Sequence, residues 1–148
     1  MIKVSDVERL REATGAGVMD CKRALTDAAG DFDRAVALIR ERGFIKAEKK
    51  SDRGTGAGAL ESYFHNNRIG VLLELRCETD FVARTEEFKT LAHELAMQVA
   101  AMDPADTAAL LSQPYFRDEQ TTVEHMIKSV IAKVGENIQV ARFCRYEL

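Results

Sequence analysis

The sequence is poor in cysteine and has no CxxC pair. Its three cysteines, Cys21, Cys77 and Cys144, lie far apart along the chain. Their odd number and wide spacing argue against a disulfide framework and against a structural zinc site, and they favour a reducing, cytoplasmic compartment. An unpaired cysteine could still form a disulfide between two copies of the chain.

Long apolar runs and an excess of basic charge are also lacking. No run approaches the roughly 20 apolar residues that span a bilayer, and the start, MIKVSDVERL, becomes charged too early for a secretory signal. The 24 acidic and 21 basic residues give a net charge of -3. A general binder of nucleic acid or membrane surfaces would be basic, so we expect neither partner, although a local basic patch is compatible with this balance.

The chain shows no constellation typical of a metal, cofactor or catalytic site. His65, His93 and His125 come from different predicted elements, without ligand-like spacing, so we expect no metal. The glycine-rich stretch at 54–58 precedes a predicted strand, which is typical of a hinge rather than a phosphate-binding loop, and we expect no cofactor. A nucleophile pair of Cys77 and His65 is the one enzymatic alternative. A buried cysteine and a solvated histidine are the simpler interpretation.

What the chain does contain begins with a three-helix pattern in residues 1–43. Ser5 and Glu8 have the spacing of a capping box at the first helix, and Gly43 is predicted to end the third. Residues 44–58 hold four basic residues and three glycines. We expect them to form a linker that is helical at its start and flexible at its end.

Residues 59–148 predict an α+β domain with a small antiparallel three-stranded sheet and helices packed on one face. Apolar residues alternate without a break over 69–77, the clearest strand, and Asn66-Asn67 predicts the hairpin turn before it. A long apolar stripe capped by Thr85 predicts a helix that ends at 103–104.

The rest of this domain is only partly readable. Residues 105–120 show no clear pattern. The spacing of Thr121 and Glu124 is that of a second capping box, which predicts another helix, and residues 137–148 have the pattern of a last strand.

The octet CETDFVAR, residues 77–84, joins the clearest strand to the long helix. Phe81 there has two interpretations of similar weight from pattern alone: a core residue at the sheet end, or a side chain displayed on rigid supports for a partner. We expect Cys77 to close the buried face, Thr79 to shape the turn and Val82 to pack inward. Arg84 is open between a partner contact and a solvated surface residue.

Three separate stretches resemble the bacterial elongation factor Ts family, in the family's order. They are REATGAGVMDCKRAL at 11–25, TDFVAR at 79–84 and GENIQVARF at 135–143. The resemblance covers residues 1–103 and 110–148, and the N-terminal part looks like a ubiquitin-associated module. The sequence departs from the family between these ranges, because members usually carry a further segment after the long helix.

The resemblance implies a translation factor that exchanges guanine nucleotide on elongation factor Tu and is not an enzyme. It would bind the GDP-bound and nucleotide-free forms of that GTPase. Asp80 and Phe81 would act as a wedge near the nucleotide and Mg²⁺ site, within a partner-binding motif formed by Thr79, Asp80, Phe81, Val82, Ala83 and Arg84. GDP would then leave and GTP would reload. Met19 and Lys22 would dock the N-terminal module on another face of the same GTPase domain.

Domain roles and oligomeric state follow from the same resemblance. Residues 1–43 would be the partner-docking module, and 59–148 the core and dimerisation domain. Short members of the family tend to form two-fold dimers, and a three-stranded sheet leaves a face or an edge to be covered. Cys144 on the last strand could approach its mate. The main rival is a protein-interaction adaptor with a ubiquitin-associated-like module and a dimerising α+β domain.

Overall fold

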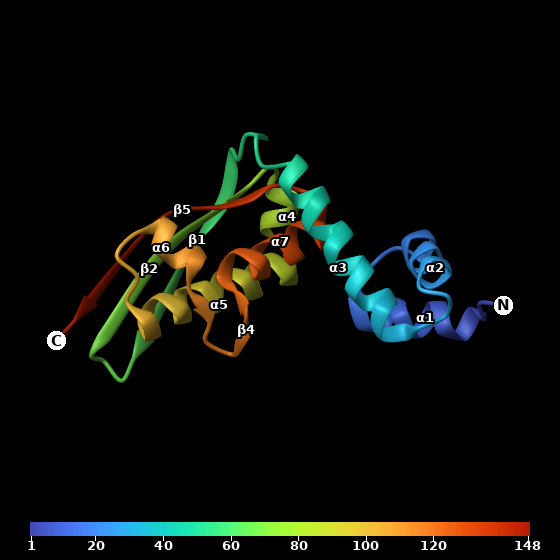
Figure 1. The fold of residues 1–148 in the computed structure, drawn as a ribbon. Helices are drawn as coiled ribbons and strands as arrows, with labels where there is room; N and C mark the ends of the chain where they lie inside the picture. The colour runs from blue at the N-terminus through green and yellow to red at the C-terminus, as the bar shows by residue number, and fades with distance from the viewer. The chain divides into compact units, whose positions relative to one another are not determined.

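The computed structural model describes residues 1–148, which form two compact units, Met1–Lys46 and Ala47–Leu148 (Figure 1). The first unit consists of α1 (Val4–Thr14), α2 (Val18–Asp27) and most of α3 (Phe32–Lys49). Its core is thin because most of the buried side chains are small. The buried residues are Leu10, Cys21, Ala24, Leu25, Ala28 and Ala35.

Two predicted helix boundaries in this unit are wrong. The first helix begins at Val4 and its N-cap residue, Lys3, makes no side-chain capping bond, so Ser5 lies inside the helix. The third helix continues through Gly43 to Lys49. A single glycine inside a helix costs only about 1 kcal/mol relative to alanine. Good helix formers follow it, and Ala47 is buried in the core of the second unit, so the helix is not interrupted there.

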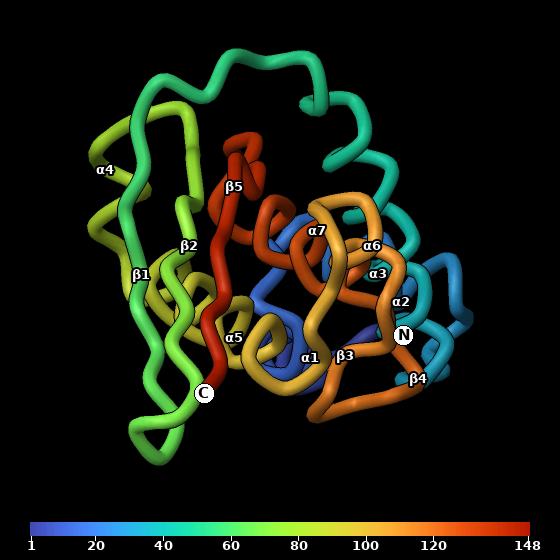
Figure 2. Tube along the Cα trace, turned by 90° about the vertical axis from the view of Figure 1, so that its left-hand side faces the viewer, coloured from blue at the N-terminus to red at the C-terminus, as the bar shows by residue number.

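The second unit is an antiparallel sheet covered on one face by helices, as the sequence predicts. The strand order is β1 (Ala57–His65), β2 (Ile69–Cys77), β5 (Ile138–Glu147). Asn66 and Asn67 form the β1–β2 turn with φ values of 51° and 56°, the left-handed conformation that asparagine tolerates. Helices α5 (Glu86–Met102) and α7 (Val123–Val134) lie to one side of the sheet (Figure 2).

The inner face of the sheet packs against α5 and forms the main core. Val71, Leu73, Leu75 and Cys77 are buried there, which confirms the alternation predicted for this strand. Where β2 pairs with β5, the register shifts between Glu74 and Leu75. This bulge lets Val140 and Phe143 both contact the core although they are three residues apart.

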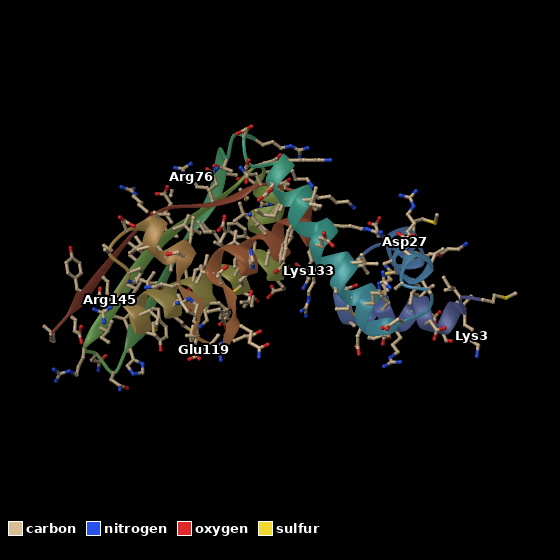
Figure 3. The ribbon with its side chains drawn as sticks, in the orientation of Figure 1. Lys3, Asp27, Arg76, Glu119, Lys133 and Arg145 are labelled. Atoms are coloured by element: carbon tan, nitrogen blue, oxygen red, sulfur yellow. The ribbon has the colours of Figure 1, made fainter.

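The end of α5 is tied to the last strand by one arginine. Arg145, labelled in Figure 3, donates from Nε and Nη2 to the Ala100 carbonyl at 3.2 and 3.1 Å. The last carbonyls of a helix have no partner within the helix, so this arginine stabilises the α5 C-terminus. Asp103 then leaves the helix in the left-handed conformation, with Pro104 after it, as predicted.

The stretch that had no readable pattern forms α6 (Thr107–Ser112) and a small hairpin of β3 (Pro114–Tyr115) and β4 (Asp118–Thr122). Gln98 of α5, fully buried, holds this hairpin: its amide donates to the Pro114 carbonyl at 3.0 Å and its oxygen accepts from the Phe116 N–H at 2.9 Å. The second predicted capping box is displaced by one residue, because Thr122 caps α7 by accepting from the His125 N–H.

Candidate partner-binding site

The TDFVAR stretch forms a single helical turn, α4 (Asp80–Ala83), between the end of β2 and the start of α5. Thr79 caps it, its hydroxyl accepting from the Val82 N–H at 3.4 Å. Thr85 donates to the Val82 carbonyl at 2.7 Å and accepts from the Phe88 N–H at 3.3 Å. Two threonines therefore fix this turn, one on each side.

Phe81 and Val82 are adjacent but point to opposite environments. The Phe81 side chain is 84% exposed, whereas Val82 is 6% exposed and lies in the core. The structure thus decides between the two interpretations of Phe81: it is displayed, and Val82 packs inward as predicted. Since exposing a phenylalanine to water is unfavourable, a displayed one on a fixed turn is a candidate contact residue.

The charged neighbours of Phe81 are unpaired. Asp80 and Arg84 are exposed and take part in no salt bridge or side-chain hydrogen bond. Both charges therefore stay available to a partner at the same edge of the molecule. Figure 1 places α4 at one end of the sheet, and the β1–β2 turn lies at the other end.

A carboxylate from the third family-like stretch, residues 135–143, holds the turn from outside it. Glu136 accepts from the Thr79 N–H at 3.0 Å with Oε1 and from the Thr79 hydroxyl at 2.8 Å with Oε2. The two residues are 57 positions apart, and no local pattern in the sequence indicates this contact. The resemblance offered one signal, because it marked both 79–84 and 135–143 without saying that they meet.

A second contact joins the end of β2 to the start of β5, and here the carboxylate comes from the β2 side. Glu78 accepts from the Asn137 N–H at 2.8 Å and lies 3.6 Å from the Arg53 guanidinium. Asn137 is buried, and its amide donates to the Ser51 and Arg53 carbonyls at 3.3 and 2.9 Å. Hydrogen bonds therefore join the turn, the start of β5 and the segment that follows α3.

Cys77 supports the turn but has no catalytic partner. It is buried, and its thiol lies 3.1 Å from the Thr79 carbonyl. Burial raises the pKa of this thiol, and the nearby Glu136 charge raises it further. His65 lies at the other end of the hairpin, because Cys77 is opposite Ala57 whereas His65 is opposite Ile69. The Cys77–His65 alternative is therefore wrong.

The two candidate residues of the N-terminal unit lie on α2. Met19 is 60% exposed, and Lys22 is exposed three residues further along, so they share one face of the helix. Most of the Met19 side chain is uncovered within its own unit. This face of α2 is a second candidate contact surface.

The comparisons with known proteins decide the family. The family model described as Elongation factor TS matches residues 78–148. An Elongation factor Ts of Thermotoga neapolitana is 42% identical over 186 positions, which cover 96% of this chain and 94% of that protein. Another, from Fervidobacterium nodosum, is 41% identical over 193 positions, covering 99% and 98%. The chain belongs to the elongation factor Ts family.

Compared with these family members, the chain is short. The alignment to the Thermotoga neapolitana protein has 186 positions and the chain has 148 residues, so the relative has residues with no counterpart here. The matched part of the elongation factor Ts model includes both the turn at 79–84 and its Glu136 contact. That the missing segment falls after α5, in the region between residues 103 and 110, stays a prediction.

Two further observations bear on the site. No group of three or more histidine, cysteine or acidic side chains is arranged to hold a metal ion. None of the helices combines the length and the apolar character that crossing a membrane would require.

Proposed function

We propose that this chain is a nucleotide-exchange factor that binds elongation factor Tu with GDP bound and promotes release of the GDP. The observation that carries the proposal is the exposed Phe81 on a single helical turn that is capped and clamped on both sides. A displayed aromatic on a rigid support suits a hot-spot contact in a partner's pocket. Membership in the family supports exchange over an unrelated adaptor.

Exchange needs no covalent chemistry, only a difference in affinity. Release of GDP from a GTPase that binds it with nanomolar affinity must overcome a binding free energy of about 12 kcal/mol. A protein that binds the nucleotide-free form better than the GDP-bound form weakens the binding of GDP. By reciprocity, GDP weakens the binding of that protein by the same coupling free energy. A rigid wedge beside the nucleotide and Mg²⁺ site gives this difference, and GTP can then reload the empty GTPase.

The motif residues have separate roles in this proposal. Phe81 enters the partner, and Asp80 and Arg84 meet it with unpaired charges. Thr79 holds the turn by its hydrogen bonds and Val82 by packing in the core. Ala83, which is half-buried, is the last residue of the turn. The proposed site of action is the cytoplasm, where translation takes place.

We also propose that Met19 and Lys22 dock the N-terminal module on a second face of the same GTPase domain. Both are exposed on one face of α2. An apolar side chain beside a cation is suited to a contact that combines burial with charge.

The Lys22 contact gives a specific prediction. Lys22→Ala should raise the half-saturating concentration for stimulated GDP release about threefold at low salt, because one surface ion pair contributes up to about 1 kcal/mol. The difference should shrink as ionic strength rises, and the rate at saturation should not change. Lys3→Ala, an exposed lysine at the start of α1, is the matched control. If the two variants have the same half-saturating concentration, Lys22 is not part of the interface.

A homodimer through the outer face of the sheet is part of the proposal. Leu60, Phe64, Leu72 and Tyr146 are 64, 71, 46 and 78% exposed. The register places Phe64, Gly70 and Tyr146 in one row across the three strands, and Leu72 beside Cys144 in the next row. Four large apolar side chains on the face opposite α5 form one patch, and a second copy would present the same patch across a two-fold axis.

The test of the proposed function is displacement of fluorescent GDP from elongation factor Tu by the wild-type chain. The release rate should rise with the concentration of the chain and then level off. The plateau separates the action of the wedge from the strength of docking, which the half-saturating concentration reports.

A further inference from the structure

The helical turn that displays Phe81 has little stability of its own. Helix α4 has four residues, and an isolated helical turn is not stable in water. The Phe81 ring is 84% exposed and contributes almost no packing to the molecule. The direction in which Phe81 points is therefore set by the backbone of the turn, and that backbone depends on the groups that hold it.

Those groups come from two sides of the turn. Val82 in the core and Thr85 at the start of α5 fix its C-terminal half. On its N-terminal side the preceding residue, Glu78, is held by the Asn137 N–H. Thr79 itself is held by the Glu136 carboxylate, which accepts from both the backbone N–H and the hydroxyl of Thr79. Because that hydroxyl also accepts from the Val82 N–H at 3.4 Å, a chain of hydrogen bonds runs from Glu136 into α4.

We propose that Glu136 is a positioning residue for nucleotide exchange: its carboxylate clamps Thr79 and so fixes the direction in which Phe81 is displayed. This inference rests on the proposed function and adds a residue outside the TDFVAR stretch. Glu136 acts through Phe81, because its carboxylate holds the backbone N–H and the hydroxyl of Thr79 at the start of the turn.

Loss of the clamp should act mainly on the step that displaces the nucleotide. A turn without the clamp can still contact the partner, but it must become ordered in the complex. The conformational entropy lost in that ordering reduces the free energy available to displace the nucleotide. Glu136→Ala should therefore lower the plateau rate of stimulated GDP release about tenfold, since hydrogen bonds to a charged group are the strong ones. The half-saturating concentration should change less than about threefold if docking residues elsewhere are intact.

Three companion variants make this test specific. Glu136→Gln retains an acceptor for the Thr79 N–H and should keep most of the plateau rate. Thr79→Val removes the hydroxyl that donates to Glu136 and accepts from the Val82 N–H. It should therefore lower the plateau at least as much as Glu136→Ala does, and it tests the clamp even if Glu136→Ala folds poorly. Glu94→Ala removes another carboxylate with two partners, Tyr115 and Arg117, and should leave the plateau unchanged.

The decisive comparison is the double variant Phe81→Ala/Glu136→Ala. If Glu136 acts only through the wedge, the double variant releases GDP at the plateau rate of Phe81→Ala alone. A further tenfold loss in the double variant would overturn the positioning role. A wild-type plateau for Glu136→Ala beside a lowered one for Phe81→Ala would overturn this inference and leave the proposed function standing. A wild-type plateau for Phe81→Ala would overturn both.

Discussion

Phe81→Ala should lower the plateau rate of stimulated GDP release from elongation factor Tu by about 30-fold or more, the effect of losing an interface hot spot of about 2 kcal/mol. The side chain is the largest apolar group that the turn exposes, and alanine leaves nothing to enter the partner. The turn itself should persist, because Thr79, Val82 and Thr85 hold it without the ring. The measurement is stopped-flow release of fluorescent GDP over a range of concentrations.

The same substitution should hardly change the stability of the protein. An 84% exposed side chain loses little packing on truncation, and surface substitutions usually stay within about 0.5 kcal/mol. Met102→Ala, which truncates an exposed apolar residue at the end of α5, is the control and should release GDP like the wild type. A plateau for Phe81→Ala equal to that of Met102→Ala would remove the wedge assignment.

Leu72→Asp should convert the proposed dimer into a monomer. Leu72 lies on the central strand, in the row with Ser62 and Cys144, so a two-fold partner would bury the new carboxylate from both copies. An unpaired buried charge costs about 3–5 kcal/mol, which predicts a dimer dissociation constant at least about 100-fold higher. Sedimentation equilibrium would measure it.

The control for this experiment is an acidic substitution away from the outer face of the sheet. Val4→Asp introduces the same change at an exposed position in the first turn of α1, where a negative charge is compatible with the helix dipole. It should leave the mass in solution unchanged. A wild-type protein that sediments as a monomer at high concentration, or a Leu72→Asp variant that stays dimeric, would contradict the proposed interface.

The parts of the fold that the sequence predicts well are those with a local physical cause. The alternation of residues 69–77 follows from burial of one strand face, and the Asn66-Asn67 turn follows from the tolerance of asparagine for positive φ. The Thr85 cap has an equally local basis. In each case the neighbours along the chain determine the conformation.

The features that the sequence did not predict depend on distant partners. The β3–β4 hairpin consists of very short strands held by Gln98 of α5, a contact that leaves no periodic pattern. On β1, alternation alone does not say which set faces the core. The structure buries Tyr63 partly and exposes Leu60 and Phe64.

The candidate site divides in the same way. Pattern left Phe81 undecided, because a single turn is too short for a helical period to distinguish inside from outside. The family resemblance pointed to the motif, and the burial of Val82 beside exposed Phe81 explains how one turn both anchors and displays. Glu136 was missed because its contact with Thr79 crosses 57 residues and involves side-chain and backbone groups that no local motif joins.

The most direct test of exchange is the rate at which fluorescent GDP leaves elongation factor Tu when wild-type chain and excess unlabelled GDP are added together. We predict a release rate that rises with the concentration of the chain and levels off at least about 100-fold above the spontaneous rate, which corresponds to a release barrier lowered by about 2.7 kcal/mol. A release rate that stays at the spontaneous value, at concentrations where the two proteins form a complex, would contradict the account.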